Sequence, residues 1–101
     1  IDLTYANLRQ ANLSRASLFD ADLSGSDPSG ANLGEADLRE GNLSETDLTG
    51  TDLNRADLSD ANLTGAYIRD QNDGRRLVTE EQLSAAKSLT GATMPDGTIR
   101  P

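Results

Sequence analysis

The sequence contains no cysteine, no histidine and no tryptophan. Disulfides, thiolate-ligated metals and histidine acid–base catalysis are therefore excluded. Only 3% of the residues are aromatic and 35% are hydrophobic, below the roughly 45–50% typical of a globular domain. No apolar run approaches the roughly 18 residues of a membrane span, and no signal peptide is visible. We predict a soluble protein without a membrane segment.

Negative charge is in excess and is unevenly placed. Residues 1–70 carry 13 acids and 5 arginines, a net charge of −8, whereas residues 71–101 carry 4 acids and 4 bases. Binding to nucleic acid phosphates requires a basic surface. We therefore predict no direct nucleic-acid binding.

A five-residue repeat fills residues 1–70 without an insertion. Each unit has a small residue, then Asp or Asn, then an aliphatic residue, then two polar residues, as in Ala61-Asn62-Leu63-Thr64-Gly65. The aliphatic column is Leu3, Leu8, Leu13, Leu18, Leu23, Pro28, Leu33, Leu38, Leu43, Leu48, Leu53, Leu58, Leu63 and Ile68. In register, even this modest number of apolar residues can build a continuous core.

The period of five excludes a continuous helix and a long alternating strand. Within a unit the small and the large apolar residues are two apart, so both point to one face of a short extended segment. The two polar residues that follow are typical of a corner. Short sides joined by corners predict a solenoid with the apolar columns inside.

The motif A-(D/N)-L-x-x resembles the pentapeptide-repeat family. The resemblance covers fourteen consecutive units, and it implies an all-β solenoid: a right-handed quadrilateral β-helix with four units per coil. Seventy residues would then form about 3.5 coils of 20 residues. The Ala92-Thr93-Met94-Pro95-Asp96-Gly97-Thr98 stretch is similar to cyanobacterial members.

Pro28 is the one break in the aliphatic column. Proline has no N–H for a ladder and is normally confined to edges or bulges. The count stays in phase from Leu23 to Leu33, so the coil should continue. Two interpretations stay open: a locally distorted face, or a bulge displayed for a partner.

After Asp70 we expect a second region, 71–101, consisting of a loop, a helix and a tail. Gln71-Asn72-Asp73-Gly74 is typical of a turn. Thr79 and Gln82 fit a capping box, which predicts an α-helix over about 80–87 that covers the last coil. Pro95-Asp96-Gly97 predicts a tight turn. The end at Ile1 has no such cap, and we expect preceding chain, a second copy or a partner to cover it.

The Asp/Asn column is the most conspicuous polar feature. Asp27 would stack on Asp47 and Asp37 on Asp57, and such pairs could attract a hard cation. A flat column, however, offers too few converging oxygens, whereas Asp and Asn readily bond to nearby backbone. We predict no metal, no cofactor and, because no cleft or histidine supports acid–base chemistry, no catalytic residues.

The sequence favours a non-catalytic acidic scaffold or protein-interaction module with an unknown protein partner. The candidate contacts are Phe19, Asp20, Glu35, Glu40, Glu45 and Asp60. We expect a monomer, or association through the uncapped N-terminal end. A bacterial cytoplasmic location is favoured, with the periplasm and the thylakoid lumen as alternatives.

The resemblance also implies a second function. Some family members resemble B-DNA in shape and charge, bind DNA gyrase and protect it from quinolones. The repeat's charge density would approach that of duplex DNA, which carries about one charge per 1.7 Å. Arginines spread along the repeat, and Asp residues that belong to the motif itself, argue against such mimicry.

Overall fold

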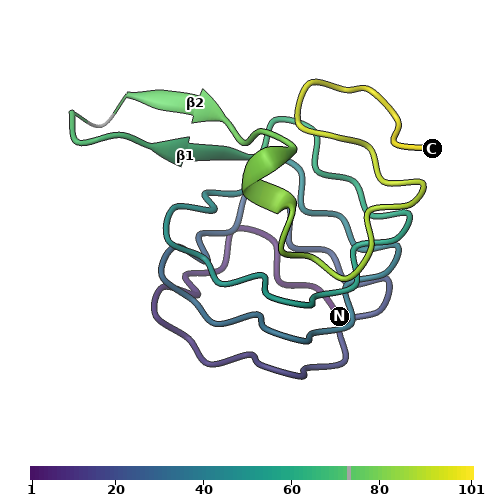
Figure 1. The fold of residues 1–101 in the computed structure, drawn as a ribbon. Coiled ribbons are helices and arrows are strands. Elements are labelled where there is room, and N and C mark those ends of the chain that lie inside the picture. The colour runs from purple at the N-terminus through teal and green to yellow at the C-terminus, as the bar shows by residue number, and fades with distance from the viewer. Residues whose placement is uncertain (73) are drawn as a thin grey trace.

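The computed structural model describes residues 1–72 and 74–101, and residues 1–70 wind into a stack of coils (Figure 1). Parallel bridges join residues that are 20 apart, for example Asp2 to Asp22, Asp22 to Asn42, and Asn42 to Asn62. A coil therefore contains 20 residues in four five-residue sides. This coil length agrees with the quadrilateral solenoid that the repeat predicts.

A typical side is held by two backbone hydrogen bonds to the next coil. The N–H of Leu13 donates to the C=O of Asn32 at 2.8 Å, and the N–H of Asn32 donates to the C=O of Ala11 at 2.9 Å. One residue per side is thus bonded through both its amide groups. Because the sides are so short, they are isolated bridges rather than long strands.

The corners are four-residue turns between one aliphatic residue and the next small residue. Ala36 N–H donates to Leu33 C=O at 3.1 Å across Gly34 and Glu35, and Glu35 has a positive φ of 59°. A positive φ at the third turn residue is the mark of a type II turn. Among the described residues, nine non-glycine residues share this strained conformation, and all of them occupy the fifth position of the repeat: Tyr5, Gln10, Arg15, Asp20, Glu35, Glu40, Glu45, Arg55 and Asp60.

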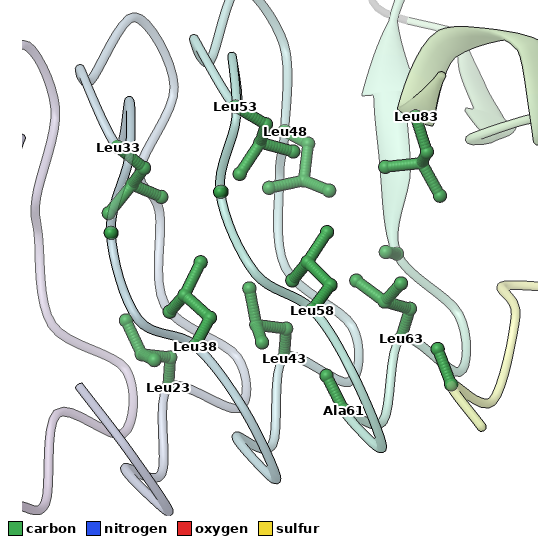
Figure 2. Packing of buried hydrophobic residues seen from close by; sticks show 14 of the residues in the cluster. Leu23, Leu33, Leu38, Leu43, Leu48, Leu53, Leu58, Ala61, Leu63 and Leu83 are labelled. Carbon is green, nitrogen blue, oxygen red and sulfur yellow. The ribbon is translucent and has the colours of Figure 1, made fainter. Parts of the chain in front are cut away.

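The aliphatic and small columns form the core inside the coils. Leu23, Leu33, Leu38, Leu43, Leu58 and Leu63 are fully buried, and Figure 2 shows these leucines layered along the stack. The predicted apolar interior is therefore confirmed. At the N-terminal end the burial is weaker: Leu3, Leu8 and Leu13 are only partly buried and Ile1 is 72% exposed.

Pro28 keeps the coil but interrupts one ladder. Its side chain is buried in the aliphatic column, yet it has no N–H to donate to Asp47 C=O. The return bond, from Asp47 N–H to Ser26 C=O, is long at 3.4 Å, and among the described residues no bridge joins Asp27 to Asp47. This geometry favours the locally distorted face.

From the fourteenth unit onward the chain forms a hairpin that was not predicted. β1 (Tyr67–Arg69) pairs antiparallel with β2 (Arg75–Leu77), and the hairpin projects from the stack in Figure 1. The turn signal at 71–74 lies at its tip, although Asp73 is outside the described residues. Val78 then returns to the stack, because its N–H donates to Ala66 C=O.

The α-helix predicted over 80–87 is wrong: the chain forms only a 3-10 helix, η1 (Glu81–Leu83). The capping pair is present, since Thr79 N–H donates to Gln82 Oε1 at 2.9 Å. The helix cannot continue because the next residues join the ladder. Ala85 C=O accepts from Arg55 N–H, and Lys87 N–H donates to Ala56 C=O.

The tail adds further sides to the stack. Ser88 bridges Asp57 and Thr93 bridges Asn62, both in parallel, so Ala92-Thr93-Met94 forms a true side of the solenoid. The chain turns after Met94, whose C=O accepts from Gly97 N–H. Ile99 then bridges Thr93 in antiparallel sense. No helix in the described part of the chain has the length and apolarity to cross a membrane.

Candidate interaction surface

The side chains of the Asp/Asn column accept hydrogen bonds from the backbone. In every unit that has Asp or Asn at this position, its Oδ1 accepts the backbone N–H two residues later. The twelve residues are Asp2, Asn7, Asn12, Asp22, Asp27, Asn32, Asp37, Asn42, Asp47, Asp52, Asp57 and Asn62. These bonds open each corner, as Asx-turns do. The column is therefore structural, and Asp and Asn are equivalent acceptors in it.

Side-chain hydrogen bonds at the same corners keep several of these carboxylates ionised. The Ser59 hydroxyl donates to Asp57 Oδ1 at 2.7 Å, and this bond lowers the pKa of Asp57. The Arg39 side chain does the same for Asp37, lowering the pKa of that carboxyl. A depressed pKa is the opposite of what a general acid needs at neutral pH.

The two carboxylate pairs considered for a cation each contact an arginine. Asp37 Oδ2 lies 2.8 Å from Arg39 Nη2, and Asp47 Oδ2 lies 3.0 Å from Arg69 Nε. Asp47 is buried, with only 7% of its side chain exposed. Among residues 1–72 and 74–101, no three acidic side chains converge as a metal site would require.

Four of the six predicted contact residues meet at one corner of the solenoid. Asp20, Glu40 and Asp60 form a column, here called the acidic ridge, and all three are exposed. The ladder fixes their spacing, since Asp20 N–H donates to Arg39 C=O at 2.9 Å and Glu40 N–H to Ser59 C=O at 3.0 Å. In the described chain, none of the three carboxylates forms an ion pair.

Phe19 borders the acidic ridge. Its ring is 48% exposed, and the Arg39 guanidinium lies 5.1 Å from its centroid on the next coil. This contact covers one face of the ring by a cation–π interaction. The exposed remainder of the ring adds an apolar element beside the three carboxylates.

The other two predicted contacts lie on different corners. Glu35 Oε2 is 3.6 Å from Arg15 Nε on the coil below. The side chain of Glu45 lies against Gly65, where an added Cβ would come 3.1 Å from Glu45 Cγ. The structure therefore does not gather Glu35 and Glu45 with the acidic ridge.

Sequence reasoning missed a cationic aromatic cluster on the hairpin. Arg75 lies 4.3 Å and Arg69 5.9 Å from the centroid of the Tyr67 ring. The only available signal was the Arg75-Arg76 pair after a turn. That signal does not indicate that the two strands pair and bring Arg75 to Tyr67.

A profile of pentapeptide repeats matches the chain in eight copies, over residues 1–27 and 29–70. The chain belongs to the pentapeptide repeat family. The one residue skipped is Pro28, where the structure loses a ladder bond. The family implies the right-handed quadrilateral β-helix that the 20-residue coils suggest, and its members are in general interaction or structural modules rather than enzymes.

Solved structures of other pentapeptide repeat proteins resemble this one, among them one from a cyanobacterium and one from a plant. HetL, a pentapeptide repeat protein involved in regulating heterocyst differentiation in the cyanobacterium Nostoc sp. strain PCC 7120, is 32% identical, with a TM-score of 0.43. The match covers 98% of this chain, which spans 60% of HetL. A pentapeptide repeat protein from the Arabidopsis thaliana thylakoid lumen is 23% identical over 97% of this chain and 79% of its own, with a TM-score of 0.33. No curated protein matches the chain.

Proposed function

We propose that this pentapeptide repeat chain is a non-catalytic module that binds another protein. The observation that carries the proposal is the acidic ridge. Its carboxylates are exposed and lie in fixed register on the ladder, whereas the aspartates of the separate Asp/Asn column accept the corner hydrogen bonds. A basic patch on a partner protein would complement the ridge, and the rim of Phe19 would add apolar contact.

Two sets of variants test this proposal. Asp20→Asn, Glu40→Gln and Asp60→Asn together remove three charges from the ridge without altering the corner bonds. Asp2→Asn, Asp22→Asn and Asp52→Asn remove the same charge from the Asp/Asn column and keep every acceptor. We expect the ridge variant to lose a partner captured by the wild-type chain and the column variant to keep it. Equal losses would mean that net charge, and not the ridge, drives capture.

DNA mimicry toward a type II topoisomerase is the second candidate. The observation in its favour is a carboxylate repeated once per coil. Against it, arginines neutralise other acids: Arg9 Nε lies 3.9 Å from Asp27 Oδ2, and Arg15 and Arg39 are also paired. A gyrase supercoiling assay separates the two functions, because a DNA mimic inhibits the reaction and a general docking module leaves it unchanged.

We further propose a bacterial cytoplasmic location, with the periplasm and the thylakoid lumen, where the Arabidopsis neighbour is found, as alternatives. Association through the N-terminal end is supported by the exposure of Ile1 and the partial exposure of Leu3, Leu8 and Leu13. Sedimentation of the purified chain over a range of concentrations tests this association. A single monomeric species throughout would exclude it.

A further inference from the structure

One side of the upper coil lacks the ladder partners that the other sides have. Later chain bonds to three of the four sides: Lys87 N–H donates to Ala56 C=O, Thr93 N–H to Ala61 C=O, and Val78 N–H to Ala66 C=O. On the fourth side, Thr51 C=O accepts no backbone hydrogen bond and Leu53 N–H donates none within the described chain. We call this pair of groups the open ladder position.

The lower coils show what these groups bind when they are occupied. On the same side, Ala31 C=O accepts from Asp52 N–H at 2.9 Å, and Leu33 N–H donates to Asp52 C=O at 2.8 Å. Both bonds go to one residue of a parallel strand. The open ladder position is therefore arranged to bind both amide groups of one residue in an extended segment.

The position is open because the chain leaves the solenoid there. β1 and β2 carry it outward, and it returns at Val78, so η1 occupies the next level without bonding to Thr51 or Leu53. A groove of about 260 Å³ lies between η1 and the coil below. Its apolar lining residues are Leu48, Leu53, Ile68, Val78 and Leu83, and Figure 2 shows Leu48, Leu53 and Leu83.

Cationic side chains stand at both ends of this side. Arg69 lines the groove on the corner before it, and Arg55, on the corner after it, is exposed and forms no ion pair within the part of the chain that is described. Asp52, at the middle of the side, is exposed and points away from the core. Arg69 is already paired with Asp47, at 3.0 Å. An acidic residue would therefore be favoured at the end of a bound segment beside Arg55 and disfavoured above Asp52.

We propose that the open ladder position and the groove bind an extended peptide segment of a partner protein. One neutral residue of the segment donates its N–H to Thr51 C=O and accepts from Leu53 N–H. Its neighbours place small or aliphatic side chains in the groove, and a flanking acid approaches Arg55. Strand addition of this kind takes affinity from main-chain bonds and specificity from alternate side chains. The inference rests on the proposed interaction function and gives it a second site, which shares no residue with the acidic ridge.

A labelled peptide, acetyl-Glu-Ala-Asn-Leu-Glu-amide, is the probe. The control peptide carries N-methyl-asparagine, which keeps the charge and replaces the N–H that Thr51 C=O would accept by a methyl group. We expect the N-methyl peptide to bind at least about tenfold more weakly, the equivalent of about 1.4 kcal/mol. Equal affinity of the two peptides would overturn the proposed backbone pairing.

Amide exchange of the ¹⁵N-labelled chain locates the bound peptide without any substitution. We expect peptide to slow exchange at Leu53 by at least tenfold and to leave Leu33 unchanged, because the Leu33 amide is already bonded to Asp52. Binding without protection of Leu53 would overturn the site. Protection that rises with protein concentration in the absence of peptide would mean that a second copy fills the position, which also overturns the proposal.

A groove-filling variant gives an independent test. Ile68→Trp should block the peptide, whereas Ile99→Trp, at a site 71% exposed and away from the groove, should not. If the Ile68→Trp chain fails to fold, Arg55→Ser replaces it, with Arg15→Ser two coils lower as its control. A partner that binds the acidic ridge and ignores these changes would disprove the peptide site while leaving the interaction function intact.

Discussion

Replacing Pro28 by leucine should stabilise the protein. Leucine fills the same position in the neighbouring coils, and the substitution Pro28→Leu supplies the N–H that Asp47 C=O lacks. A restored hydrogen bond contributes about 1 kcal/mol, and one further buried carbon adds about 0.8 kcal/mol. Loss of proline's restriction on the unfolded chain opposes this gain by about 0.4–1 kcal/mol. The net expectation is about 1 kcal/mol of added stability.

Urea denaturation followed by circular dichroism measures this change. The midpoint should rise while the slope m stays constant, because the substitution alters stability and not the surface exposed on unfolding. In a thermal scan a gain of this size corresponds to roughly 4–8 °C for a domain of this length. A destabilised Pro28→Leu chain would refute the reasoning, since it would show that the distorted side has no room for the standard unit.

Four further predictions follow from the same packing and bonds. Ser26→Ala should stabilise by about 1 kcal/mol, because the buried Ser26 hydroxyl has no hydrogen-bond partner; a chain less stable than wild type in urea would contradict this. Leu43→Ala should cost about 2–5 kcal/mol through loss of a fully buried side chain, measured as a fall in the urea midpoint. Asp57→Ala should lower the free energy of unfolding by about 1 kcal/mol, because it removes the acceptor of the corner hydrogen bond, whereas Asp57→Asn keeps the acceptor and should cost little. Equal losses of stability in the two variants would show that the charge of Asp57 matters more than its hydrogen bond. The fold lowers the pKa of Asp57, so the stability contributed by its ionised carboxylate is complete well above the unfolded pKa of 3.8 and is lost as the pH falls through the lower folded pKa. Thermal melts from pH 7 to pH 2 should therefore show a smaller loss of stability at low pH for Asp57→Asn than for the wild-type chain. Identical pH profiles of the two chains would contradict this linkage.

The repeated part of the fold could be predicted because its period fixes almost every contact. An aliphatic residue at every fifth position determines which side chains face inward, and the ladder then brings residues 20 apart together. That register also brings Phe19, Asp20, Glu40 and Asp60 to one corner. Glu35 and Glu45 are also acidic, but they are not separated from these residues by a multiple of 20, so they lie on other corners.

The C-terminal part was predicted less well because a helix signal and the ladder of the solenoid compete for the same residues there. Thr79 and Gln82 do form their predicted cap, but the ladder takes up Ala85 and Lys87 before a second helical turn can form. The hairpin pairs Tyr67 with Leu77, a contact that no period signals. The open ladder position depends on where the chain leaves and rejoins the stack, and it therefore has no signature in residues 51–53.

The central claim is that the Asp/Asn column builds the scaffold while the corner residues are recognised by a partner. Six column aspartates can be changed to asparagine together, leaving the buried Asp47 untouched: Asp2, Asp22, Asp27, Asp37, Asp52 and Asp57. The measurement is the dissociation constant of this variant for a captured partner, beside that of the wild-type chain. The account predicts a folded chain whose affinity changes by less than about tenfold. A folded variant that no longer binds would contradict the account and would mean that the partner recognises the charge of the column itself.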